Sequence, residues 1–198
     1  MTKKDTLFYK IIKPLLAFLV YFLVRPKIVG KENIPKEGPV VFAGNHTKWL
    51  DPIVLCAIVK KRQIHFLAKI ELFKGPISII TKGMGAIPVN RKIHDKKALQ
   101  TSITLLKEGL CIGVFPEGTI NRTKNLIMPF KIGAVKMSKE ANAILTPFVI
   151  TGKYHLFRKT IKIEFLKPLK IEDDLELSNQ KLMKVIKDKI RKEQKNDS

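Results

Sequence analysis

The 198-residue sequence is poor in cysteine and contains nothing that divides it into parts. Neither of its two cysteines, Cys56 and Cys111, has a second cysteine or a histidine at metal-ligand spacing. We therefore expect no metal site and no disulfide framework, and thiols in apolar runs are typical of a protein from a reducing compartment. Because no internal repeat or low-complexity linker interrupts the chain, we expect one domain.

Acidic residues are also scarce, since 17 Asp and Glu stand against 38 Lys and Arg, giving a formal net charge of +21. This balance indicates a polyanionic partner, either nucleic acid or an anionic membrane. A generally lysine-rich proteome would explain part of the excess. No aromatic and basic RNA-binding signature is present, so we expect no nucleic acid. The apolar fraction of 45% excludes wholesale disorder.

Long hydrophobic runs are missing as well, the longest being ten residues, LLAFLVYFLV at 15–24. As a helix this run is about 15 Å long, half of a hydrocarbon core of about 30 Å. No small-residue cleavage site follows, so a signal peptide is not expected. We predict a helix at 5–24 that enters one leaflet, with Lys10 and Lys13 at phosphate level. The alternative is an ordinary amphipathic helix packed on the domain.

In the rest of the chain, short apolar segments typical of strands alternate with segments of helical periodicity. This alternation favours an α/β fold with a mixed, mostly parallel central sheet flanked by helices. We accordingly divide the chain into a membrane-associated helix at 1–26 and a catalytic domain at 27–198. The helix expected at the C-terminus is basic and could assist on an anionic leaflet or simply be solvated. Strands are expected at 38–44, 63–69, 110–118, 144–151 and 159–169, and helices at 52–61, 97–109, 131–142 and 179–195.

A histidine and an aspartate follow the first of these strands in the stretch FAGNHTKWLD. Asp51 precedes Pro52, a pattern that predicts an aspartate N-cap at a helix start. The Asp51 carboxylate could also fix the tautomer of His46, whose other ring nitrogen could then take a proton from a hydroxyl. A histidine and an aspartate at this spacing often occur by chance, so the pair alone leaves a purely structural role open.

A second turn at a strand end contains Glu117, Gly118 and Thr119. Its backbone N–H groups and hydroxyl could face an oxyanion, or the turn could be merely tight. Basic residues follow these loops: Arg91 after GAIPVN, and Arg122 and Lys131 after the second turn. Converging near a histidine, they indicate an anionic, phosphorylated substrate. In so basic a chain, each could instead be a solvated surface residue.

Four ordered blocks in the sequence, NHTKWLD, GAIPVNR, FPEGT and ILTPFVITG, resemble those of the glycerolipid acyltransferase family, specifically the 1-acylglycerol-3-phosphate acyltransferases. Lys69 in AKIELFKGP and Lys131 in FKIGA are also typical of that family. The resemblance covers residues 28–152 and implies a glycerol-3-phosphate acyltransferase-like fold.

The resemblance implies that His46 is the general base on an acceptor hydroxyl and that Asp51 orients it. The alkoxide would attack an acyl thioester directly, converting lysophosphatidic acid to phosphatidic acid in phospholipid biosynthesis. The donor would be acyl-CoA or acyl carrier protein, and no cofactor is implied. Lys69 and Arg91 would hold the acceptor phosphate.

Glu117, Gly118 and Thr119 would shape the acceptor site. The family commonly has Arg where this chain has Ile120, so Arg122 could take that place. A different lysophospholipid acceptor therefore stays open, as does a basic membrane- or nucleic-acid-binding protein. We expect the protein at an anionic membrane surface, on the cytoplasmic face of the cell membrane.

Overall fold

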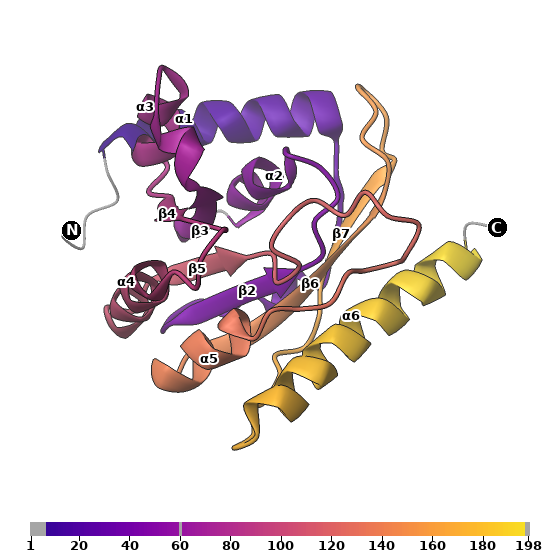
Figure 1. The fold of residues 1–198 in the computed structure, drawn as a ribbon. Helices are drawn as coiled ribbons and strands as arrows, with labels where there is room; N and C mark the ends of the chain where they lie inside the picture. The colour runs from indigo at the N-terminus through magenta and orange to yellow at the C-terminus, as the bar shows by residue number, and fades with distance from the viewer. Residues whose placement is uncertain (1–6, 60, 197–198) are drawn as a thin grey trace.

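The computed structural model describes residues 7–59 and 61–196 (Figure 1). Its described residues form one seven-stranded sheet, in the order β1-β7-β6-β2-β5-β3-β4. Every neighbouring pair is parallel except β6 and β7, so the predicted mixed, mostly parallel sheet is confirmed. The strands are β1 (Lys27–Val29), β2 (Val40–Gly44), β3 (Ile64–Lys69), β4 (Ile87–Val89), β5 (Cys111–Val114), β6 (Ile144–Gly152) and β7 (Ile161–Phe165).

Helices cover both faces of this sheet because its central strands carry apolar side chains on both sides. On β2, Val41 packs in the same cluster as Leu106 of α4 and Ile186 of α6, whereas Phe42 packs with Leu55 of α2. The helices are α1 (Leu7–Leu19), α2 (Asp51–Ile58), α3 (Ile77–Gly83), α4 (Lys96–Lys107), α5 (Gly133–Glu140) and α6 (Leu175–Asn196). Short π and 3₁₀ turns occupy Val20–Val24, Lys31–Asn33 and Ile70–Phe73.

The N-terminal helix α1 packs one face on the domain and leaves the other open. Tyr9 is buried, and Lys13 Nζ donates to the backbone oxygens of Val59 and Arg62 at 2.8 and 3.0 Å. The prediction that Lys13 lies at phosphate level is therefore wrong, because the carbonyl groups at the end of α2 need a donor and this ammonium supplies it. The side chain of Lys10 and residues 5 and 6 lie outside the described part.

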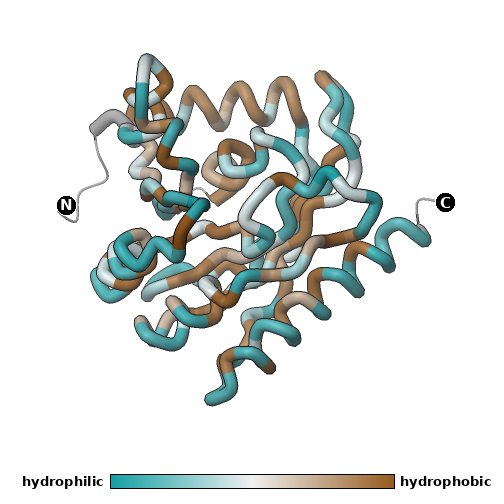
Figure 2. Tube along the Cα trace, viewed as in Figure 1, coloured by the Kyte–Doolittle hydropathy of each residue, from teal (hydrophilic) through white to brown (hydrophobic). Residues whose placement is uncertain are grey.

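The outer face of α1 and its π turn is apolar and exposed, and Figure 2 shows hydrophobic colour along most of α1. No helix within residues 7–59 and 61–196 is both long and apolar enough to cross a membrane. The division of the chain at residue 26 stays a prediction. The outer face carries Ile11, Leu15, Phe18, Leu19 and Phe22.

The sheet brings three loops together at one edge, since β2 is parallel to both β5 and β6. The carboxyl ends of these strands therefore point the same way, and the segments that follow them meet. His46 follows β2, Glu117 follows β5 and Tyr154 follows β6. This edge is where the candidate site lies.

Candidate active site

The loop between β2 and α2, which carries His46, is fixed to neighbouring segments by backbone and side-chain hydrogen bonds. Asn45 Nδ2 donates to the backbone oxygen of Ile150 at 2.9 Å, and the Ile150 N–H donates to Asn45 Oδ1 at 2.8 Å. The Asn121 N–H donates to the backbone oxygen of His46 at 3.0 Å. The loop is thus held by β6 on one side and by the segment after β5 on the other.

His46 and Asp51 form the predicted pair, with 2.8 Å between Nδ1 and Oδ2. The Asp51 side chain is fully buried, and its Oδ2 also accepts the N–H groups of Thr47 and Lys48 at 2.6 and 2.9 Å. The predicted N-cap is wrong: α2 begins at Asp51 itself, and the carboxylate faces back to the loop instead of to the helix N–H groups. Asp-Pro marks the helix start in either case, so the pattern does not reveal which way the carboxylate points.

The pair leaves one imidazole nitrogen available for chemistry. An ionised carboxylate only accepts hydrogen bonds, so Asp51 places the ring proton on Nδ1 and leaves Nε2 as an acceptor. The His46 ring stacks on Phe115, with 3.9 Å between ring centroids and 13° between planes. His46 is 7% exposed, so its ring can move little. In this geometry, Nε2 could accept a proton from a hydroxyl group.

The side chain of Glu117 supports the loop between β2 and α2 by hydrogen bonding to its backbone. Its buried carboxylate accepts the His46 N–H at Oε1 and the Met128 N–H at Oε2, both at 2.8 Å. Burial raises the pKa of Glu117 above its ordinary value, and these two donors counteract part of the shift. Glu117 therefore joins the His46 backbone to the segment that returns towards α5.

The backbone conformation of the turn after Glu117 explains why glycine occupies position 118. Gly118 has φ +75°, the left-handed conformation that glycine tolerates best. A Cβ there would lie 3.0 and 3.1 Å from Cε and Nζ of Lys131, whose side chain crosses the turn. Thr119 and Arg122 are exposed beside it. The structure thus brings Lys131 to the turn, as a substrate-binding role would require.

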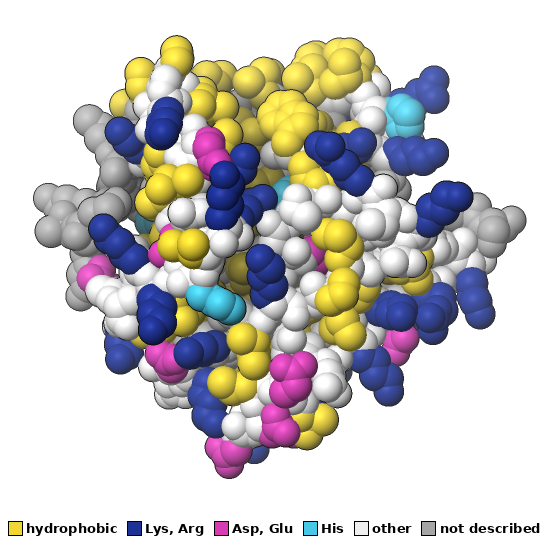
Figure 3. Space-filling model, viewed as in Figure 1, with side chains coloured by type: hydrophobic (Ala, Val, Ile, Leu, Met, Phe, Trp, Pro, Cys, Tyr) yellow, Lys and Arg dark blue, Asp and Glu magenta, His cyan; other side chains and the backbone are white. Residues whose placement is uncertain are grey.

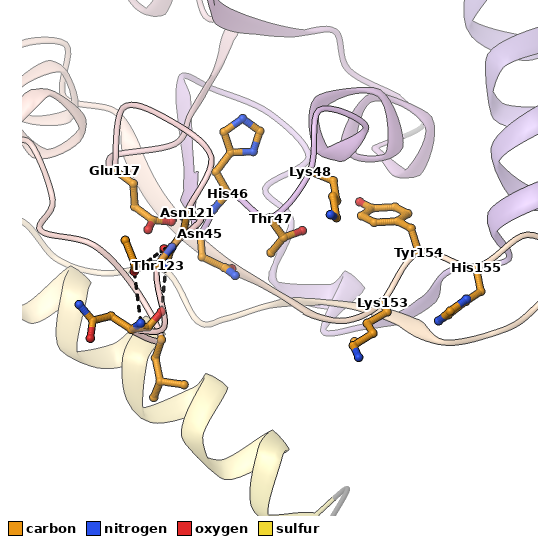
Figure 4. Close-up of a pocket in the computed structure, with 13 residues that line it drawn as sticks. Asn45, His46, Thr47, Lys48, Glu117, Asn121, Thr123, Lys153, Tyr154 and His155 are labelled. Atoms are coloured by element: carbon orange, nitrogen blue, oxygen red, sulfur yellow. Dashed lines mark hydrogen bonds between the residues drawn. The ribbon is translucent and has the colours of Figure 1, made fainter.

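A pocket of about 490 Å³ opens where the three loops meet. It is lined by residues 45–48 after β2, by residues 152–155 at and beyond the end of β6, and by Glu117 with parts of the segment 121–126. Figure 4 shows the His46 imidazole standing clear of the backbone between Glu117 and Lys48, while Lys153 and His155 point away from it. Of the predicted site residues, only His46 and Glu117 line this pocket.

Lys69 and Arg91, the two residues expected to hold phosphate, lie outside this pocket, at the carboxyl ends of the paired strands β3 and β4. Lys69 ends β3, where it pairs in register with Val89, and Arg91 follows two residues beyond. Lys69 Nζ lies 3.4 Å from Glu71 Oε1. Desolvation lowers the pKa of Arg91, and the Glu71 carboxylate offsets part of that shift. Both cations are exposed and share this one carboxylate. Neither of the two lines the pocket beside His46.

Sequence reasoning missed Tyr154 and Asn45. The Tyr154 hydroxyl donates to Asp51 Oδ1 at 2.7 Å across 103 residues of sequence. No local pattern signals such a contact, because it exists only once β6 lies beside β2. Within the described residues, no group of three or more His, Cys, Asp or Glu side chains could hold a metal ion.

Comparison with known proteins matches residues 25–151 to the Acyltransferase family model. The chain belongs to the Acyltransferase family. It is 39% identical over 127 residues to the 1-acyl-sn-glycerol-3-phosphate acyltransferase of Bacillus subtilis, which is 64% of this chain and 62% of that one. It is 34% identical over 142 residues to the enzyme of the same name from Borreliella burgdorferi, which is 68% of this chain and 54% of that one.

A solved structure agrees with this membership at the level of fold. The 1-acyl-sn-glycerophosphate (LPA) acyltransferase PlsC from Thermotoga maritima superposes with a TM-score of 0.75 at 19% identity, covering 98% of this chain and 84% of that chain. The chain spans only about half to three fifths of the length of the curated relatives described above. Sequence comparison therefore gives the family, and structural comparison agrees with the α/β fold.

Proposed function

We propose that the protein transfers a fatty acyl group from an acyl thioester to the free hydroxyl of lysophosphatidic acid, giving phosphatidic acid for phospholipid synthesis. The observation that carries this proposal is the 2.8 Å contact between His46 Nδ1 and buried Asp51 Oδ2, beside an open pocket that His46 lines. Relatives named for this activity at 39% and 34% identity support it.

In the proposed reaction, His46 Nε2 accepts the proton of the acceptor hydroxyl as its oxygen attacks the thioester carbonyl carbon. Asp51 stabilises the imidazolium that forms. The tetrahedral intermediate then expels the thiolate, which takes the proton from His46, so an ester and a free thiol leave together. No acyl-enzyme, metal or cofactor takes part. General base catalysis of this kind contributes about 10²- to 10⁴-fold to the rate.

We assign the acceptor phosphate to Lys69 and Arg91. Lys69 ends β3, Arg91 follows the paired strand β4, and Glu71 interacts electrostatically with both cations, where a bound phosphate would compete with it. Lys131 and Arg122, near the turn at Gly118, are the second basic group and could compensate for Ile120. Since Ile120 replaces a basic residue of the family pattern, a different lysophospholipid is the second candidate acceptor.

We further propose that the protein works on an anionic membrane, at its cytoplasmic face. Figure 1 shows α3, α1 and the connection between β6 and β7 all reaching the upper edge of the molecule. Figure 3 shows hydrophobic side chains gathered along that edge, with basic side chains beside them. Exposed apolar residues on these elements include Ile79, Phe18 and Phe157, and Phe157 packs edge-on against Phe22 at 5.6 Å. Apolar surface of this kind, rimmed by Lys and Arg, favours an anionic bilayer.

An assay of the purified protein tests the function directly. Lysophosphatidate is offered with acyl-CoA and with acyl carrier protein separately, and lysophosphatidylglycerol and lysophosphatidylcholine replace it in parallel. We expect phosphatidate with at least one donor and a clear preference for the phosphomonoester acceptor. Equal or better use of another lysophospholipid would move the acceptor assignment to the second candidate. No transfer to any lysophospholipid would overturn the proposal.

A salt titration separates the membrane proposal from nucleic-acid binding. We expect the protein to bind vesicles of phosphatidylglycerol and phosphatidylcholine and to keep part of that binding at high salt, because apolar contacts are not screened. Binding to duplex DNA should be weaker and should vanish as salt rises. Tighter binding to DNA than to vesicles would reverse this order and reject the proposal.

A further inference from the structure

Among the described residues, the Asp51 carboxylate accepts a hydrogen bond from one donor outside its own loop. Its Oδ2 is bound by His46, Thr47 and Lys48, all within five residues of it. Its Oδ1 accepts only the Thr47 hydroxyl at 3.1 Å and the Tyr154 hydroxyl at 2.7 Å among the described residues. Tyr154 follows β6, three residues beyond the end of the family match at 151.

We propose that Tyr154 is a positioning residue for acyl transfer, which acts through Asp51 on His46 and rests on the function proposed above. A carboxylate can rotate about its Cβ–Cγ bond unless both oxygens are held. Tyr154 holds Oδ1 from the opposite side of the carboxylate, so Oδ2 stays directed at His46 Nδ1. Without it, only the longer contact from Thr47 restrains Oδ1.

A tyrosine suits this task because its hydroxyl is neutral. A lysine or arginine at the same place would hold Asp51 but would cancel the charge that stabilises the imidazolium. Burial, and then the Asp51 carboxylate, raise the pKa of Tyr154 far above its ordinary value, so the hydroxyl remains a donor over any practical pH range. Tyr154 also lines the pocket, so its ring shields the carboxylate from the solvent there.

Other charged and titratable groups line the same pocket from three segments of the chain. Glu117 approaches from the segment after β5, Lys48 belongs to the catalytic loop, and Lys153 and His155 flank Tyr154. Replacing Tyr154 with phenylalanine leaves all four in place and removes one oxygen atom. A change in pH dependence between the two proteins therefore reports the hydroxyl alone.

The test is Tyr154→Phe, compared with Tyr9→Phe. We expect kcat to fall about 5- to 10-fold, the loss of one hydrogen bond to a charged group, with little change in either KM. Without this donor, the Asp51 carboxylate can turn away from Nδ1 and stabilises the His46 imidazolium less, so the acidic limb of the pH–rate profile moves down by about half to one unit. The Tyr9 hydroxyl donates to the backbone oxygen of Arg62, after the far end of α2, so Tyr9→Phe should leave the profile in place.

An NMR titration of the His46 ring keeps this test separate from the acyltransferase proposal, since it needs no substrate. The midpoint should move to lower pH in Tyr154→Phe and stay in place in Tyr9→Phe, whether or not the wild type acylates lysophosphatidate. An unchanged or raised midpoint would overturn the positioning role. A Tyr154→Phe enzyme with normal kcat and a raised acceptor KM would also overturn it, because the hydroxyl would then bind substrate.

Discussion

The interior of the site and its rim are built in opposite ways. In the interior, the polar groups of His46, Asp51 and Glu117 are buried and each meets a partner at 2.8 Å. At the rim, Lys69 and Arg91 are exposed and both interact with Glu71, and the outer face of α1 is apolar and exposed. The interior is thus organised before substrate binds. The rim instead carries exposed charged and apolar groups that are available to bind substrate or a membrane. Interior changes should therefore lower kcat, and rim changes should weaken binding.

The largest expected effect is on the interior, from Asp51→Asn. An asparagine amide can donate to His46 Nδ1, which favours the tautomer with its proton on Nε2 and removes the base. We expect kcat to fall by about 10²- to 10⁴-fold while the acceptor KM changes little. Steady-state kinetics with lysophosphatidate measure both constants. A variant that lost affinity and kept kcat would break the comparison, since it would place Asp51 among the binding residues.

The phosphate assignment predicts a rim effect from Arg91→Ala. We expect the acceptor KM to rise by about 10-fold or more, the loss of a hydrogen bond to a charged group, while the donor KM stays nearly constant. Glu71→Gln should lower the acceptor KM, because the two cations would no longer share their charge with a carboxylate. Lys107→Ala, an exposed cation on α4, is the control and should change neither constant. An unchanged acceptor KM in Arg91→Ala would remove it from the phosphate site.

The apolar part of the rim predicts a change in membrane binding. Phe18 of α1 and Phe22 of the π turn that follows it are both exposed, and their rings stack with 5.9 Å between centroids. Phe18→Asp should weaken binding to phosphatidylglycerol vesicles about 10-fold, the loss of one inserted aromatic side chain. Leu177→Asp on α6, where the leucine is similarly exposed, is the matched control. Equal loss in both variants would mean that charge, not α1, decides vesicle binding.

The smallest expected effect is on the free energy of unfolding, through the ionisation of Glu117. Its pKa is raised by burial, so across the range above its ordinary value of 4.5 the folded protein binds more protons than the unfolded chain. The Glu117 contribution to the free energy of unfolding is then present at low pH and is lost as pH rises. The wild type should therefore lose stability relative to Glu117→Gln as pH rises above about 4.5, measured by urea unfolding. The opposite slope would show that the N–H donors dominate over burial.

Much of this organisation was predictable from local sequence. Short apolar strands with turn residues at their ends predicted the sheet, and they correctly placed His46 and Glu117 after strands. Strands β1 and β4 and helix α3 were missed, because three to seven residues carry too little periodicity. Boundaries also moved: β5 ends at Val114, four residues before the predicted strand end, because the chain turns there towards Glu117.

Contacts that depend on the assembled sheet could not be predicted from the sequence. Tyr154 reaches Asp51 only because β6 pairs with β2, and Lys13 caps α2 only because α1 folds back across it. The direction of the Asp51 carboxylate was also hidden, since the Asp-Pro pattern is the same for a cap and for a catalytic orienter. Local patterns thus located the reacting side chains, and tertiary contacts decided how each one is held.

The most direct test of the central claim is acyl transfer by His46→Ala. The account predicts that the purified variant loses at least about 10²-fold in kcat, keeps the wild-type circular dichroism spectrum and binds phosphatidylglycerol vesicles as the wild type does. A His46→Ala protein that converted lysophosphatidate at near the wild-type rate would show that another group removes the hydroxyl proton.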